Sequence, residues 1–188
     1  DCNMSKPIVI TAGHSEIDSG AVNTVTKDRE ADIVRDMRNM VAHYLTQENI
    51  PFLSDGTGLE NLPLSKAIEL AKKGCIAVEF HCNAAASEKA VGVEALSNIK
   101  HKGISQQLCQ AVAIEMGNSL RGDLGWKPEN SGQHSRLGFI SKGNGIILEL
   151  FFISNPRELA TWKARKWLVA KRVAKVLIET YYKEHNHV

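Results

Sequence analysis

The run IVITAGH, residues 8–14, decides how the rest of the chain is interpreted. It begins with β-branched residues, which are typical of a buried strand. Ala12 and Gly13 follow, and a glycine lets the backbone turn sharply. His14 therefore stands at the carboxyl end of the first strand, where open α/β sheets place their ligand sites. From this position we predict that His14 is the first ligand of a catalytic metal ion.

Outward from this strand, short apolar runs alternate with segments of helical period. We expect strands at residues 8–13, 50–54, 75–81, 91–97, 136–140 and 145–153, helices at 28–47, 64–73, 104–120 and 156–182, and a long loop at 121–135. Strands that alternate with helices indicate an α/β fold. We predict a single domain with a mostly parallel twisted sheet of about six strands and helices on both faces.

Length and composition suit one domain spanning residues 1–188. We expect residues 1–6 to be disordered or foreign to the natural chain, and residues 184–188 to form a tail. The net charge of +2 is too small to indicate nucleic-acid binding, and no apolar run approaches the ~20 residues of a membrane span. The four cysteines are expected to be reduced thiols, with a disulfide as the alternative.

Three ionisable residues occupy positions that the pattern predicts to be buried, where ionisable side chains are rare. Glu30 shares a helix face with apolar residues and is expected to point at the sheet, unless it lies in an exposed first turn. His81 ends a strand and precedes small residues that leave room for a ligand, although a hydrogen-bonded core histidine is the alternative. Glu149 interrupts an apolar strand, which suits proton transfer or a buried salt bridge.

Two imidazoles and one carboxylate form a common catalytic zinc set that leaves a fourth position for water. His14, Glu30 and His81 provide those groups. A second carboxylate close to the metal then serves as acid and base, and Glu149 is the candidate. The sequence therefore predicts a zinc hydrolase.

Several motifs occur in one order along the chain. They are Gly13-His14, Asp18-Ser19-Gly20-Ala21, Arg29-Glu30-Ala31, His81-Cys82-Asn83-Ala84, Gly92-Val93-Glu94 and Leu148-Glu149 followed by Ser154-Asn155. In this the chain resembles the zinc-dependent N-acetylmuramoyl-L-alanine amidases of the Amidase_3 type, over residues 8–180. The resemblance implies that His14, Glu30 and His81 bind zinc and that Glu149 is catalytic. It also implies cleavage of the amide between N-acetylmuramic acid and L-alanine in peptidoglycan.

Three further residues are candidates around this site. Glu79 stands where the family usually has a small polar residue, on the same strand face as His81, and is expected to contact that histidine from outside the ligand set. Asn83 follows within the same motif as a candidate substrate contact. Arg136 is predicted either to grip a substrate carboxylate or to form a structural salt bridge.

The last predicted helix is strongly basic. This indicates either a solvated face of a core-packed helix or electrostatic contact with the anionic cell envelope, without stable membrane insertion. We expect a monomer. Without a signal peptide, a wall-binding domain or an autoinhibitory insertion, the chain resembles a phage endolysin, made in the host cytoplasm and released to the wall. The alternatives are a bacterial autolysin exported by a signal peptide since removed, and a zinc peptidase acting on the stem peptide.

Overall fold

The computed structural model describes residues 6–129 and 138–185. In chain order the elements are β1 (Ile8–Ala12), α1 (Glu30–Gln47), β2 (Phe52–Ser54), α2 (Leu64–Ala71), β3 (Ile76–Asn83), β4 (Glu94–Ser97), the short 3₁₀ helix η1 (Ile99–His101), α3 (Lys102–Met116), β5 (Trp126–Pro128), α4 (Gly138–Ser141), β6 (Ile146–Phe152) and α5 (Pro156–His185). Strands and helices alternate along most of this order, which confirms the predicted α/β class.

The strands form one six-stranded sheet in the order β2-β1-β3-β6-β4-β5. Four of its pairings are parallel, and β4 runs antiparallel to β6. The parallel register brings Glu149 of β6 beside His81 of β3. The antiparallel pairing brings Glu94 of β4 beside Glu149 from the other side. The sheet therefore aligns three polar side chains on neighbouring strands near its carboxyl edge.

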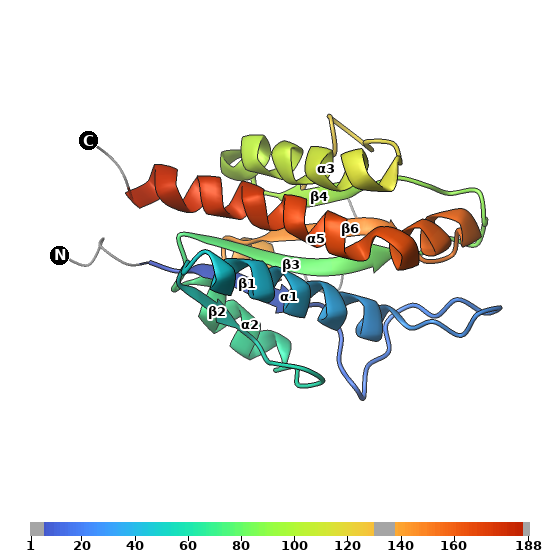
Figure 1. Ribbon diagram of the computed structural model, residues 1–188, viewed down its shortest axis with the longest axis horizontal. Helices are drawn as coiled ribbons and strands as arrows, with labels where there is room; N and C mark the ends of the chain where they lie inside the picture. The colour runs from blue at the N-terminus through green and yellow to red at the C-terminus, as the bar shows by residue number, and fades with distance from the viewer. Residues whose placement is uncertain (1–5, 130–137, 186–188) are drawn as a thin grey trace.

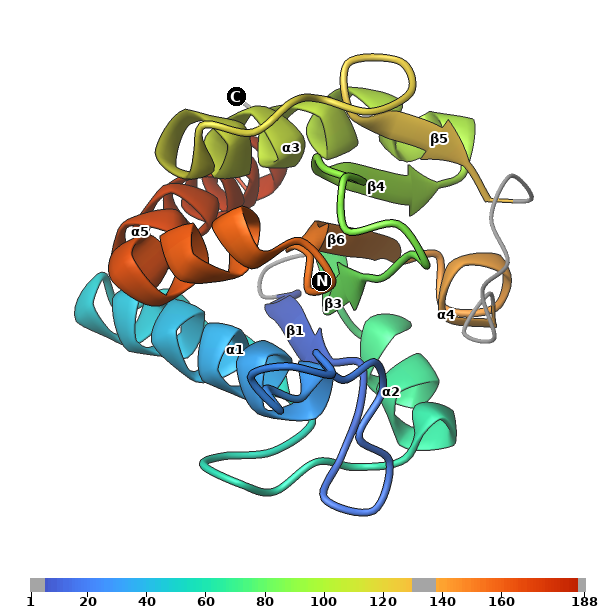
Figure 2. The ribbon, with the colours of Figure 1, turned by 90° about the vertical axis from the view of Figure 1, so that its right-hand side faces the viewer.

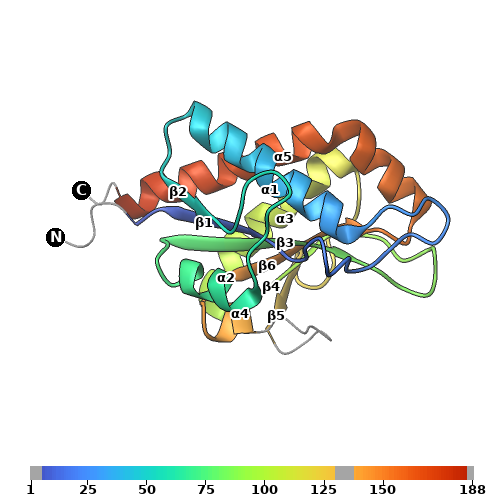
Figure 3. The same cartoon turned by 90° about the horizontal axis from the view of Figure 1, so that it is seen from below.

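Helices cover both faces of the sheet (Figure 1). The long helices α1, α3 and α5 lie on one face, and the short helices α2 and α4 lie on the other (Figures 2 and 3). Because side chains alternate along a strand, Ile8 and Ile10 pack into the larger core under the long helices, while Val9 packs under the short ones. Both faces of the central strands are thereby buried, as the apolar residues on both faces of β6 predict.

The structure corrects three of the predicted segments. A strand does not span residues 136–140, because Gly138–Ser141 forms α4 and buries Phe139 and Ile140 against α2. The sixth strand is instead β5, inside the predicted loop, where Trp126 pairs with Ala95 of β4. The last helix is also longer than the predicted 156–182, because α5 continues to His185, whose ring stacks on Tyr181 with centroids 4.1 Å apart.

Ion pairs tie the basic helix α5 to its neighbours. Lys163 reaches Asp28 and Lys166 reaches Asp36, each at 2.6 Å. Arg165 and Arg172 both contact the Glu115 carboxylate of α3 at 2.5 Å. These contacts favour the reading of α5 as a core-packed helix with a solvated face, and envelope contact stays a prediction.

Two further sequence predictions can be compared with the described residues. Cys75, Cys82 and Cys109 are free thiols, while Cys2 lies outside the described residues. No helix within residues 6–129 and 138–185 has the length and apolar character needed to cross a membrane.

Candidate metal centre

His14 reaches the site because β1 ends in residues without bulk. The Gly13 amide donates to the Phe80 carbonyl, which keeps β1 paired with β3 up to this point. A Cβ on Gly13 would lie 2.3 Å from the His81 ring. Only glycine therefore allows the two histidines to approach, and their ring centroids lie 5.3 Å apart.

Glu30 is the first residue of α1, and its carboxylate is buried. One carboxylate oxygen accepts a hydrogen bond from the Ala21 amide at 3.0 Å, and the other accepts from the Cys82 amide at 2.8 Å. The Glu30 side chain, in the first turn of α1, thus points inward, as one of the two predicted alternatives states. The alternative of an exposed first turn is wrong.

The carboxylate of Glu30 lies between the two imidazoles. His14 Nε2 is 3.2 Å from Glu30 Oε1, and His81 Nδ1 is 3.3 Å from Glu30 Oε2. One ligand atom from each of the three residues lies within 4.8 Å of the others. A hollow of about 550 Å³, lined by His14, Asp18 and Asn61 among others, borders this cluster at His14.

The three ionisable groups of the cluster shift one another's pKa values towards their charged forms. Burial alone would raise the pKa of Glu30, but hydrogen bonds from His14 and His81 hold it well below its usual range. Burial alone would lower the pKa of His81, but hydrogen bonds to Glu30 and Glu79 raise it to about 10. The pKa of His14 is raised as well, because Glu30 outweighs its burial. Without a metal, the carboxylate is therefore ionised and the imidazoles favour their protonated forms.

The outer nitrogen of each histidine also has a partner. His81 Nε2 is 2.7 Å from Glu79 Oε1, and the Thr11 hydroxyl donates to the other Glu79 oxygen at 2.9 Å. His14 Nδ1 is 2.9 Å from Asp18 Oδ2. The contact predicted between Glu79 and His81 is thus present, and it leaves Nδ1 of His81 facing Glu30.

A buried carboxylate that the sequence reasoning did not single out lies next to Glu149. Glu94 of β4 accepts from Asn83 at 2.8 Å and from Arg121 at 2.9 Å, and Lys127 lies 3.2 Å from its second oxygen. The sequence feature that could have identified Glu94 is its position in the Gly92-Val93-Glu94 motif. Asn83 thus contacts Glu94, whereas Arg136 lies outside the described residues.

The donor set fits a tetrahedral metal ion. Zinc takes imidazole and carboxylate ligands at about 2.0–2.2 Å, so neighbouring donors in a tetrahedron lie roughly 3.3–3.6 Å apart. Each histidine nitrogen lies 3.2 or 3.3 Å from a different Glu30 oxygen, and one donor atom from each of the three residues lies within 4.8 Å of the others, so the fold brings the donors of such a site together. Fold and site together define a class: an α/β protein with a two-histidine, one-carboxylate cluster at the carboxyl edge of its sheet.

Comparison with known proteins names the family within this class. The sequence profile of the N-acetylmuramoyl-L-alanine amidases matches residues 8–179, and the chain belongs to this family. The family confirms the predicted enzyme, a hydrolase of the amide between N-acetylmuramic acid and L-alanine in peptidoglycan. No curated protein sequence matches the chain.

Solved structures agree with this assignment. A Neisseria meningitidis protein described as an N-acetylmuramoyl-L-alanine amidase is 47% identical, with a TM-score of 0.87 over 95% of this chain and 97% of that one. The catalytic domain of CwlV from Bacillus (Paenibacillus) polymyxa var. colistinus is 24% identical, with a TM-score of 0.76 over 95% and 97%. An amidase from Clostridium difficile 630 is 19% identical, with a TM-score of 0.77 over 97% and 99%. The last two show the shared fold.

Proposed function

We propose that this amidase is zinc-dependent, with His14, Glu30 and His81 as the metal ligands and Glu149 as the catalytic carboxylate. The observation that carries the proposal is the carboxylate of Glu30 between two imidazole nitrogens, at 3.2 and 3.3 Å. A zinc ion held there would polarise the amide carbonyl and lower the pKa of a bound water. The two backbone amides on Glu30 favour its ionised form, which is the form that binds a cation.

The position of Glu149 supports its role in proton transfer. It lies beside His81 in the register of β3 and β6, and its side chain is buried. We infer that its carboxylate accepts a proton from the attacking water and delivers it to the leaving amide nitrogen. That nitrogen becomes the amino terminus of the L-alanine stem, while the carbonyl carbon of N-acetylmuramic acid takes the hydroxyl.

Metal analysis and product analysis test this proposal together. We expect about one zinc ion per chain, in keeping with a single three-ligand site. Digestion of intact peptidoglycan should release L-alanine amino termini and muramyl glycan free of peptide, and a chelator should abolish both. Cuts within the stem peptide would instead indicate the peptidase alternative. Full turnover after complete metal removal would contradict the zinc proposal.

The biological setting stays a prediction. We propose a phage endolysin that is made in the host cytoplasm and acts on the wall after membrane permeabilisation, with an exported bacterial autolysin as the alternative. The amidase activity of the family suits either role. The gene distinguishes them: an endolysin gene encodes no export signal before this domain and lies among phage lysis genes, whereas an exported autolysin gene encodes such a signal.

A further inference from the structure

Strand β1 extends beyond the end of its neighbour β2. The two strands pair up to Ile10 and Ser54, where β2 stops. Backbone groups alternate in direction along a strand: the Ile8 amide donates to Pro51 on the β2 side, and the Gly13 amide donates to Phe80 on the β3 side. The amide and carbonyl of Ala12 therefore face the β2 side, past the last residue of β2. Buried backbone groups of this kind require other partners.

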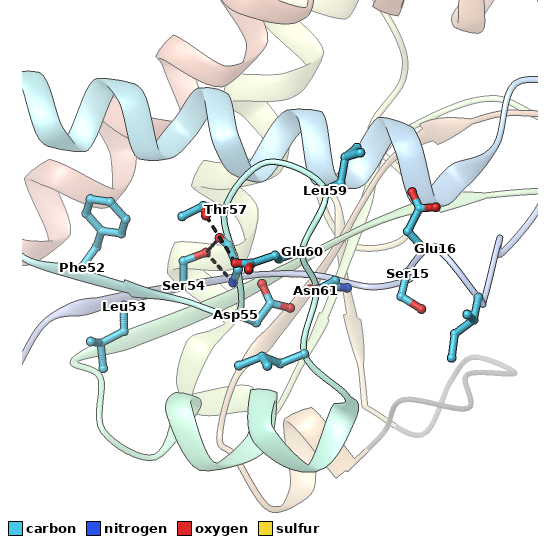
Figure 4. Close-up of a pocket in the computed structure, with 13 residues that line it drawn as sticks. Ser15, Glu16, Phe52, Leu53, Ser54, Asp55, Thr57, Leu59, Glu60 and Asn61 are labelled. Atoms are coloured by element: carbon cyan, nitrogen blue, oxygen red, sulfur yellow. Dashed lines mark hydrogen bonds between the residues drawn. The ribbon is translucent and has the colours of Figure 1, made fainter.

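Two side chains from the loop after β2 take the place of the missing strand. Both carboxylate oxygens of Asp55 lie within reach of the Ala12 amide, which donates to them at 3.3 and 3.2 Å. The Asn61 side-chain amide donates to the Ala12 carbonyl at 2.9 Å and also to the His14 carbonyl. Asp55 and Asn61 thus hold the backbone on both sides of Gly13. Figure 4 shows these two side chains among the residues that line one pocket.

A buried arginine from α1 holds these two side chains together. One terminal nitrogen of Arg38 donates to Asp55 and to Asn61, each at 3.1 Å. The other donates to the Gly58 carbonyl at 3.1 Å, at the tip of the same loop. Arg38 and Asp55 are both 0% exposed. We call Arg38, Asp55 and Asn61 the Arg38 cluster.

Stability alone explains the Arg38 cluster poorly. Removing two charges from water costs several kcal/mol per ion, and a buried pair seldom adds net stability over apolar residues of the same size. Burial indeed raises the pKa of Asp55 to about 6 and lowers that of Arg38, so the surroundings oppose both charges. What the pair provides is a fixed geometry for the end of β1, next to the candidate metal centre.

We propose that the Arg38 cluster is a positioning device for the metal site, a role that rests on the proposed zinc function. By holding Ala12 and the His14 carbonyl, it fixes the direction in which the His14 ring leaves β1. The ring must place its Nε2 atom 3.2 Å from Glu30 while Gly13 leaves no space beside His81. A loosely held β1 terminus would lose that alignment, so these residues act through His14 and do not touch the substrate themselves.

Asn61 and Asn39 provide a matched pair of variants. Asn61→Ala removes the contact with β1, and Asn61→Asp keeps an acceptor for Arg38 while removing the donor. Asn39 also accepts from Arg38, at 3.2 and 3.1 Å, and donates to the Gly58 carbonyl at 3.0 Å. Asn39→Ala therefore removes hydrogen bonds to Arg38 and to the same loop, but it leaves every hydrogen bond to β1 in place. If Asn61→Ala fails to fold, the isosteric Asn61→Asp carries the test.

The measurements are the zinc dissociation constant, from competition with a chelator, and NMR relaxation of the Gly13 and His14 amides in metal-free protein. We expect the Asn61 variants to bind zinc roughly 10- to 100-fold more weakly, the usual effect of removing a residue that orients a ligand. We expect Asn39→Ala to weaken zinc binding by much less than either Asn61 variant, because every hydrogen bond to β1 remains. Slow exchange at Gly13 and His14 should appear in the Asn61 variants alone.

Two outcomes would overturn the proposal. The first is unchanged zinc affinity in both Asn61 variants, and the second is an equal loss of affinity in Asn39→Ala. If the unmodified protein binds no zinc, the proposed zinc function is wrong. The NMR relaxation measurements then test the positioning role by themselves. In that case unchanged relaxation at Gly13 and His14 in the Asn61 variants overturns the role, whereas new exchange supports it.

Discussion

Glu149 and His14 belong to one cluster of charges, but the proposal gives them different tasks. Glu149→Ala should keep zinc and lower kcat by roughly 10²- to 10⁴-fold, because the proton-transfer group is lost and the ligands remain. His14→Ala should lose both zinc and activity. Metal content and kcat measured on the same samples separate the two effects. Substantial turnover by Glu149→Ala would contradict its catalytic role.

Metal binding should be linked to proton release. His81 has a pKa of about 10 in the metal-free site, against 6.5 in an unfolded chain, so at neutral pH it carries a proton that must leave before its nitrogen binds a cation. The apparent zinc affinity should therefore rise with pH up to about 10 and level off above that value. Calorimetry in buffers of different ionisation enthalpy measures the protons released.

A matched variant checks the origin of this linkage. Glu79→Gln keeps the shape of the residue beside His81 but removes one of the charges that raise its pKa. The rise in zinc affinity should then level off at a lower pH than in the unmodified protein. A binding enthalpy that does not depend on the buffer would contradict the linkage.

At the scale of elements, the start of α5 shows why the closing motif contains Asn155. Its side-chain oxygen accepts from the Glu158 amide at 2.9 Å, which caps the helix. Glu158 in turn accepts from the Phe152 amide at 2.8 Å and from the Gly92 amide at 3.1 Å. These contacts join α5 to the end of β6 and to the segment before β4.

Substitutions in this cap should lower thermal stability without removing zinc. Asn155→Ala should cost about 1 kcal/mol, the usual value of a lost N-cap. Glu158→Ala should cost more, because it leaves two buried backbone amides without their acceptor. Arg157→Ala, an exposed change on the same turn, is the control. Thermal unfolding should give the highest Tm for Arg157→Ala, a lower Tm for Asn155→Ala and the lowest for Glu158→Ala, and equal values for all three variants would contradict this account.

For the whole molecule, the metal should contribute to stability because its ligands come together only on folding. His14, Glu30 and His81 belong to the end of β1, the start of α1 and β3. Zinc at 100 times its dissociation constant would add about 2.7 kcal/mol, which corresponds to roughly 5–10 °C in Tm for a chain of this size. A chelator should lower Tm by that amount. The same chelator should leave His14→Ala unchanged, and an equal shift there would point to an unspecific effect.

Local pattern was enough to predict much of the fold and the three residues that the structure brings together in the candidate metal centre. Short apolar runs placed β1, β3 and β6, and the period of 3.6 placed the helices α1, α3 and α5. Strand ends and an interrupted apolar run singled out His14, His81 and Glu149, and a shared helix face singled out Glu30. These patterns involve residues that are close together in sequence. They are readable because each strand or helix must place apolar side chains wherever it packs against the core.

Contacts between distant segments were decided only by the tertiary structure. The short strand β5 forms because Trp126 pairs with β4, and α4 forms because Phe139 and Ile140 pack against α2. Glu94 meets Arg121 across 27 positions, and Arg38 meets Asn61 across 23. No local period encodes such pairings, because their free energy comes from long-range burial of backbone and charge. The sequence by itself therefore determined which residues are the candidates for the chemistry, and the tertiary structure decided which residues hold them in place.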